Sequence, residues 1–252
     1  MVAVETVVRS SGLKLVAHLA RPETHPGSGL NGLVLCHSFP AGPRHDAAGD
    51  TYPELADRLA RDTGWAVLSF NFRGTGDSEG DFSLAGWLED LRSATGHMLV
   101  DGDVAGVWLA GFGRGASLAL CAAGEDDRVR GVAAAAAAAD FDDWAGDPAG
   151  FLAHARRLGV VRDPRFPAEL AAWSRELKEI RPLALVGKIP PRPVLLLHGS
   201  DDDVVPLMDA RTLADAANGQ VELRIISGAG HGLRHDPRAI AVLMGWMERQ
   251  RV

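Results

Sequence analysis

The stretch VAGVWLAGFGRGASLALCAA, residues 104–123, decides the fold. Val104–Ala110 is a short apolar run typical of a buried strand, and Ala116–Ala123 is a run of small and aliphatic residues typical of a buried helix. Between them, Gly111–Gly115 has glycine at every second position, which is typical of a sharp turn. The stretch therefore predicts a strand that turns directly into a helix, the building unit of an α/β sheet.

The same alternation of strand and helix extends in both directions along the chain. Further strands are expected at residues 3–9, 14–20, Leu33–Cys36, Ala66–Phe70, Val129–Ala139, Val194–His198 and Val221–Ser227. Further helices are expected at Tyr52–Asp62, Leu84–Leu99, Leu207–Ala217 and Ala239–Arg249. In Val129–Ala139 seven consecutive alanines favour a helix by propensity, but the alternation favours a strand, and we expect the strand. Repeated βαβ units predict a mainly parallel sheet with helices on both faces, and the opening hairpin adds an antiparallel edge.

Residues 140–192 interrupt this alternation. They hold two helical patterns, Pro148–Leu158 and Pro167–Leu185, with no strand between them. The simplest interpretation is a helical cap inserted over one end of the sheet. No linker separates two independent units, so we expect residues 1–252 to form a single domain.

Composition restricts the class of protein. The 252 residues include 26 Lys and Arg against 33 Asp and Glu, a net charge of −7, which argues against a nucleic-acid or anionic-membrane partner. Hydrophobic residues make up 46% of the chain, enough for a folded core. There are two cysteines, no basic and apolar leader pattern at the N-terminus, and no apolar run near the ~20 residues of a membrane span. These features predict a cytoplasmic α/β protein.

Polar residues follow five of the expected parallel strands. These segments are His37 with Ser38, Asn71–Asp77, Gly111–Gly115, His198–Pro206 and Gly228–Gly232. Because ligands of open α/β sheets bind at the carboxyl ends of the strands, we expect these segments to form one site. An acid after one strand and a histidine after the next would let a carboxylate orient an imidazole.

At these positions the chain resembles the α/β-hydrolase family, most closely its small esterase, dienelactone-hydrolase and serine-aminopeptidase-like branch. The turn from His37 to Pro40 is similar to the family's oxyanion turn, and the loop from Asn71 to Ser78 is characteristic of it. The resemblance covers nearly the whole chain except residues 140–192. It implies an α/β-hydrolase fold and hydrolysis of an ester-like or acyl-like small molecule.

The resemblance also implies the acid and the histidine of the site. The family's acid motif falls on residues 198–206 and makes Asp202 the acid, with Asp201 and Asp203 as alternatives because three acids follow one another. The histidine motif falls on residues 230–232 and makes His231 the catalytic histidine. The order of nucleophile, acid and histidine along the chain matches as well.

The chain departs from the family at the nucleophile. The family's G-x-S-x-G turn reads here Gly111-Phe112-Gly113-Arg114-Gly115, so glycine stands where the serine is expected. Glycine cannot act as a nucleophile. Three hypotheses remain open: a protein acting at an Asp202–His231 site without the serine, a non-catalytic protein that binds a small molecule, and a serine esterase represented by a Ser-to-Gly variant at position 113.

The remaining candidate residues belong to the same turns. The backbone N–H groups of Arg114 and of Phe39 (or Ser38) would form the oxyanion hole. Ser38 and Ser117 are candidate substitute nucleophiles. Candidate substrate-binding residues are His37, Ser38, Phe112 and Trp144. No metal-ligand spacing occurs, so we expect neither a metal nor a cofactor, and the oligomeric state stays open.

Overall fold

The computed structural model describes residues 1–23, 29–40, 42, 51–101 and 103–250. Within them the chain forms an eight-stranded sheet in the order β1-β2-β4-β3-β5-β6-β7-β8. The strands are β1 Val2–Ser10, β2 Leu13–Arg21, β3 Leu30–Cys36, β4 Ala66–Phe70, β5 Val104–Phe112, β6 Val129–Ala135, β7 Val194–Gly199 and β8 Glu222–Ile226. From β4 to β8 neighbouring strands are parallel, whereas β1 pairs with β2 and β2 with β4 in antiparallel fashion. The expected mainly parallel sheet with an antiparallel N-terminal hairpin is confirmed.

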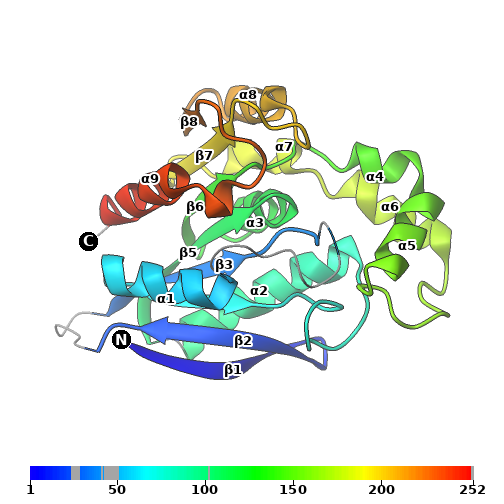
Figure 1. Ribbon diagram of the computed structural model, residues 1–252, viewed down its shortest axis with the longest axis horizontal. Coiled ribbons are helices and arrows are strands. Elements are labelled where there is room, and N and C mark those ends of the chain that lie inside the picture. The colour runs from blue at the N-terminus through cyan, green and yellow to red at the C-terminus, as the bar shows by residue number, and fades with distance from the viewer. Residues whose placement is uncertain (24–28, 41, 43–50, 102, 251–252) are drawn as a thin grey trace.

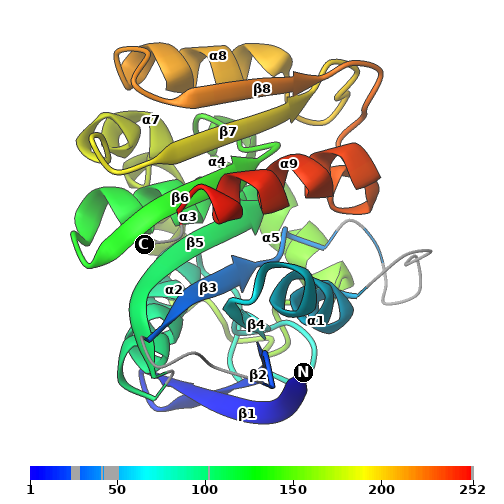
Figure 2. The same ribbon diagram turned by 90° about the vertical axis from the view of Figure 1, so that its left-hand side faces the viewer.

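Helices cover both faces of the sheet. They are α1 Tyr52–Thr63, α2 Leu84–Val100, α3 Arg114–Glu125, α4 Asp142–Gly146, α5 Pro148–Arg157, α6 Leu170–Glu179, α7 Pro182–Leu185, α8 Leu207–Ala216 and α9 Pro237–Glu248, with short 3-10 helices at Val186–Lys188 and Leu233–His235. Figure 2 shows α1 and α9 in front of the strands, where their apolar side chains share one core with the sheet. Helices α2, α3 and α8 pack on the other face in a second core. No helix in the described ranges is long and apolar enough to cross a membrane.

The alanine run behaves as a strand, but only in part. β6 ends at Ala135, four residues before the expected end, because Ala136 has a φ of 53°. This left-handed conformation ends the extended backbone, although the Ala136 N–H still donates to the Leu197 oxygen at 2.8 Å. The sheet pattern therefore outweighs the helix propensity of alanine as far as residue 135.

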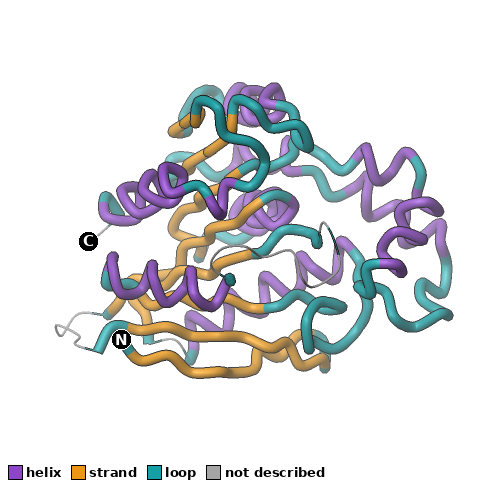
Figure 3. The backbone as a smooth tube through the Cα atoms, in the orientation of Figure 1, coloured by secondary structure: helices purple, strands orange, loops and turns teal. Residues whose placement is uncertain are grey.

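Residues 140–192 contain helices and loops and no strand, as the backbone colouring of Figure 3 shows. The expected helix Pro167–Leu185 is wrong as one element, because it is divided into α6 and α7. Pro182 disfavours a helical conformation at Arg181, whose φ and ψ are −131° and 108°. Helices α4, α5 and α6 lie together at the right of Figure 1, whereas α7 packs against α3 and α8. Only the first part of the insertion thus lies beyond the carboxyl edge of the sheet.

Candidate active site

The turn between β5 and α3 is built on glycine. Gly113 has a φ of 53° and a ψ of −126°, and its N–H donates to the Ala135 oxygen of β6 at 2.8 Å. This positive φ favours glycine, and a side chain at position 113 would be strained. A Cβ on Gly115 would lie 2.2 Å from the His37 oxygen. Because Gly113 and Gly115 have no side chains, this turn can pack closely against the loop that follows β3.

An acid and a histidine meet beside this turn. His231 Nδ1 lies 2.9 Å from Asp202 Oδ2 and 3.2 Å from Oδ1, which confirms the expected hydrogen bond. The Asp202 carboxylate is 0% exposed, while the His231 side chain is 27% exposed. Asp202 Oδ1 also accepts from the N–H groups of Val204 and Val205 at 3.0 and 2.8 Å. The carboxylate is thus fixed by its own loop and binds the Nδ1 side of an accessible imidazole.

The same loop decides between the three consecutive acids. Asp201 accepts a hydrogen bond from the Ser200 hydroxyl at 2.6 Å, and Asp203 is exposed. His198 lies behind the pair, fully buried, with Nε2 2.9 Å from the Val205 oxygen and 3.4 Å from Asp202 Oδ2. Asp202 is therefore the acid that the fold directs at the histidine.

His37 holds the loop after β3 in place. Its Nδ1–H donates to the Ser38 oxygen at 2.7 Å, and its Nε2 accepts from the Phe72 N–H at 3.1 Å, with the Thr75 hydroxyl 3.2 Å away. Burial lowers the pKa of His37 to about 4, since only the neutral ring fits these partners. Both ring nitrogens of His37 form hydrogen bonds within the protein. His37 therefore positions Ser38 and has no ring nitrogen left to bind a ligand.

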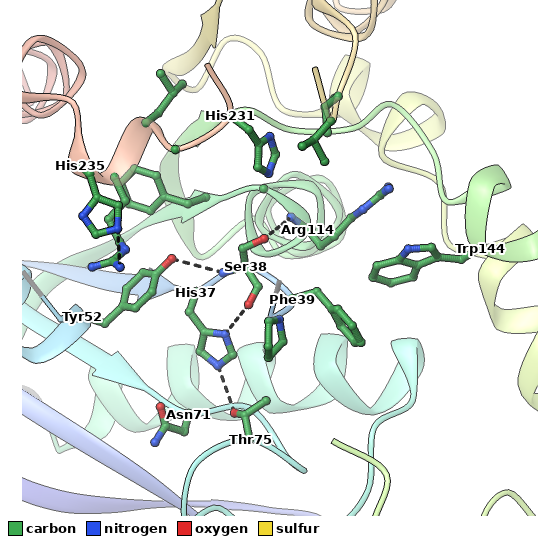
Figure 4. Close-up of a pocket in the computed structure, with 18 of the residues that line it drawn as sticks. His37, Ser38, Phe39, Tyr52, Asn71, Thr75, Arg114, Trp144, His231 and His235 are labelled. Carbon is green, nitrogen blue, oxygen red and sulfur yellow. Dashed lines mark hydrogen bonds between the residues drawn. The ribbon is translucent and has the colours of Figure 1, made fainter. Parts of the chain in front are cut away.

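Ser38 fills the space that Gly113 leaves empty. A Cβ built on Gly113 would lie 2.3 Å from Ser38 Oγ and 3.3 Å from His231 Nε2. The Arg114 backbone N–H, directly after the turn, donates to Ser38 Oγ at a long 3.4 Å. In Figure 4 the Ser38 hydroxyl reaches toward Arg114, on the side of the site where His231 lies. A hydroxyl thus occupies the space next to Gly113 that a side chain facing His231 would fill, but it comes from the loop after β3.

Arg114 contributes its backbone to the site and its side chain to the packing around it. The guanidinium lies over the Trp144 ring at 4.6 Å, donates to the Asp140 oxygen at 3.0 Å and forms an ion pair with Asp143. Burial lowers the pKa of Arg114, and the carboxylates of Asp143, Asp209 and Asp140 oppose that shift. The side chain therefore connects α3 to α4.

These residues surround a pocket of about 610 Å³. Asp202 is not part of the lining and lies beneath His231. The lining includes these expected site residues: His37, Ser38, Phe39, Phe112, Gly113, Arg114, Trp144 and His231. The lining also includes residues that no sequence motif singles out individually: Tyr52, Asn71, Thr75, Asp143, Arg234 and His235. Asn71 and Thr75 stand in a loop that was singled out as a whole, whereas nothing in the sequence indicates that α1 brings Tyr52 to the pocket.

Ser117 is separated from the pocket. It is 0% exposed, its hydroxyl donates to the Ala138 oxygen at 3.0 Å, and it accepts from the Ala138 N–H at 3.0 Å. It therefore joins α3 to the segment after β6 and is no candidate nucleophile. Among the described residues no three His, Cys, Asp or Glu side chains gather as a metal site would require.

Comparison with known proteins identifies the family. Residues 33–243 match the Alpha/beta hydrolase family. Est1E from Butyrivibrio proteoclasticus with bound ferulic acid superposes with a TM-score of 0.73 at 22% identity, covering 97% of this chain and 96% of that one. The esterase domain of a Rhodothermus marinus protein gives 0.69 at 24% identity, and the alpha/beta hydrolase GrgF from Penicillium sp. sh18 gives 0.73 at 19%, each covering 99% of both chains. No curated protein matches the sequence. The strand order, the acid–histidine pair and the match over residues 33–243 lead to one conclusion: this chain belongs to the Alpha/beta hydrolase family.

Proposed function

We propose that this protein hydrolyses a small ester-like or acyl-like molecule in the pocket, with His231 as general base and Asp202 as the residue that orients it. The observation that carries the proposal is the hydrogen bond of 2.9 Å between a fully buried Asp202 carboxylate and a partly exposed His231 that lines the pocket. A protein that only binds its ligand needs neither side chain. The structural neighbour described as an esterase domain supports the same reaction class.

The geometry suits proton transfer at one atom. Because His231 Nδ1–H donates to Asp202, Nε2 carries the lone pair and faces the pocket. Nε2 takes a proton from the attacking hydroxyl or water, and the Asp202 carboxylate stabilises the imidazolium that forms. The N–H groups of Arg114 and Phe39 would stabilise the negative charge on the carbonyl oxygen. The Arg114 N–H donates to Ser38 Oγ at 3.4 Å and the Ser38 N–H to the Tyr52 hydroxyl at 3.3 Å, so either group would exchange that long contact for one to the carbonyl oxygen. No cofactor takes part in this reaction.

In this proposal Gly113 stands at the position of the family's nucleophile. Its place between β5 and α3, its positive φ and the 3.3 Å from its built Cβ to His231 Nε2 support that assignment. The same glycine favours a second candidate function, a non-catalytic protein that binds a small molecule in the pocket. The third hypothesis, a Ser-to-Gly variant, is weakened by Ser38, because its hydroxyl would lie 2.3 Å from a Cβ at position 113 and would have to rotate away.

The lining of the pocket indicates an apolar acyl or aryl group. Aromatic rings of Phe39, Tyr52, Phe112 and Trp144 face it, and aromatic side chains bury large apolar area. The ferulic acid bound to Est1E, a fold relative, is an aryl acid of this general kind. We therefore expect esters of aryl and short acyl groups as substrates, no nucleic-acid or membrane partner, and the cytoplasmic setting that the two cysteines suggest.

A panel of p-nitrophenyl esters tests the proposal. The wild-type protein should hydrolyse the short-chain and aryl members, and His231→Ala should lose at least about 100-fold in kcat/KM, the usual contribution of a general base. His97→Ala is the matched control, because His97 pairs with Asp101 near the end of α2 and lies outside the pocket lining. Binding of an ester without turnover in the wild type, and equal rates for the wild type and His231→Ala, would instead support the binding protein.

A further inference from the structure

We propose that Ser38 is the nucleophile of this site, supplying from the loop after β3 the hydroxyl that the β5–α3 turn lacks. The inference rests on the proposed function, since it names the attacking group of that hydrolysis. It starts from one geometric coincidence: the point that a Cβ on Gly113 would occupy is 2.3 Å from Ser38 Oγ and 3.3 Å from His231 Nε2. The Ser38 hydroxyl therefore occupies the space of the missing side chain, on the histidine side of the turn.

The backbone of Ser38 is fixed on both sides, which orients this hydroxyl. The Ser38 N–H donates to the Tyr52 hydroxyl at 3.3 Å, and the Ser38 oxygen accepts from His37 Nδ1 at 2.7 Å. Burial raises the pKa of Tyr52 to about 12 and lowers that of His37 to about 4, so both partners stay uncharged around neutral pH. A half-buried tyrosine and a buried histidine, both neutral, thus hold the backbone of Ser38, a residue that lines the pocket.

The surroundings of Oγ also favour its reactive form. The Arg114 N–H donates to Ser38 Oγ at 3.4 Å from the first residue of α3, a helix of 12 residues. Such a donor at a helix N-terminus stabilises developing negative charge on the oxygen. The other candidate, Ser117, is 0% exposed and shares two hydrogen bonds with Ala138, so it has neither access nor a base.

The reaction balances with these groups alone. Ser38 Oγ–H gives its proton to His231 Nε2 while Oγ bonds to the ester carbonyl carbon and the C=O electron pair moves to the oxygen. As that pair returns, the bond to the leaving alkoxy oxygen breaks, and this oxygen takes the proton from Nε2. Water then repeats the sequence on the acyl-Ser38 ester, releasing the acid and restoring the hydroxyl.

Labelling with a fluorophosphonate probe tests the inference on the full chain. We expect one adduct by intact mass, mapped by peptide mass spectrometry to Ser38, and weaker labelling in His231→Ala. Ser38→Ala should lose the adduct and at least about 100-fold in kcat/KM for the p-nitrophenyl esters. Ser174→Ala is the matched control, because Ser174 is a half-exposed α6 serine whose hydroxyl donates to the Ala171 oxygen and which lies outside the pocket. Unchanged melting temperature of Ser38→Ala separates loss of the hydroxyl from loss of the fold.

Each other outcome has a distinct meaning. One outcome is ester turnover that His231→Ala abolishes and Ser38→Ala leaves unchanged, with no probe adduct. This outcome overturns the inference and leaves the proposed function with water as the nucleophile. An adduct at another residue, or faster turnover by Ser38→Ala, also overturns it, the latter because Ser38 would then obstruct the site. Neither turnover nor adduct in the wild type removes the proposed function together with the inference. An adduct at Ser38 without turnover supports the nucleophile and overturns the proposed hydrolysis.

Discussion

At the scale of single residues, Gly113 and Ser38 exclude one another's side chains. Gly113 has a positive φ that costs a non-glycine residue about 1–3 kcal/mol, and a Cβ there would approach Ser38 Oγ to 2.3 Å. A serine at position 113 would thus need both backbone strain and a rotated Ser38. The two positions share one space, which holds either a side chain at position 113 or the hydroxyl of Ser38.

Moving the hydroxyl between the two loops tests this pairing. Gly113→Ser should lower the melting temperature by roughly 2–4 °C for each kcal/mol of strain. Its ester turnover should change little or fall, because the two hydroxyls compete for one space. The double variant Ser38→Gly/Gly113→Ser should be more stable than Gly113→Ser and should regain His231-dependent turnover. The measurements are thermal denaturation and p-nitrophenyl ester hydrolysis.

Gly113→Ala is the control for strain, since it adds the Cβ without a hydroxyl. It should match Gly113→Ser in stability and remain inactive in the Ser38→Gly background. A Gly113→Ser protein as stable as the parent would show that the turn is relaxed and that the two side chains fit together.

At the scale of elements, the sequence predicts the sheet well and its ends poorly. The eight strands follow from apolar runs between turn residues, and the acid loop follows from its motif. The end of β6 could not be predicted, because a backbone reversal at Ala136 leaves no mark in a run of identical alanines. Among Asp201, Asp202 and Asp203 the choice depends on the folded loop, whose amides bind one carboxylate. The Ser38 contact with this turn is equally tertiary, since Ser38 and Arg114 are 76 residues apart in sequence.

Ser117 tests the packing of α3 as an element. Ser117→Ala removes both hydrogen bonds to Ala138 and leaves the buried N–H of Ala138 unsatisfied. This should lower the free energy of unfolding by about 1–3 kcal/mol. We expect a lower melting temperature, measured by circular dichroism, with fluorophosphonate labelling unchanged at a temperature where the variant is folded. Loss of labelling in the folded variant would mean that Ser117 acts in the site.

At the scale of the whole molecule, one histidine connects the N-terminal hairpin to the helix that reaches the pocket. His18 of β2 lies 2.9 Å from Glu5 of β1 through Nδ1 and 2.7 Å from Asp57 of α1 through Nε2. Its side chain is 11% exposed, and α1 begins at the pocket residue Tyr52. The charge on His18 therefore influences how the edge of the sheet is held to the part of the molecule that carries the site.

This link should make stability depend on pH. Burial alone lowers the pKa of His18, but the hydrogen bonds to Asp57 and Glu5 and the charges of both carboxylates outweigh it and raise the pKa above 6.5. The stabilisation is thus complete below pH 6.5 and is lost as the pH rises through the raised pKa of the folded state. His18→Gln should reduce the free energy of unfolding most below pH 6.5, with the difference shrinking at higher pH in urea denaturation. A difference that is independent of pH would show that His18 stays neutral.

The central claim is that Asp202 and His231 act as one catalytic pair, and a double-mutant cycle measures this most directly. The kcat/KM for one p-nitrophenyl ester is determined for the wild type, Asp202→Asn, His231→Ala and the double variant. Residues that act as a unit are strongly non-additive, so we predict that Asp202→Asn adds almost no loss once His231 is alanine. Losses that multiply, or singles that retain wild-type activity, would contradict the account, because the two side chains would then act independently or not at all.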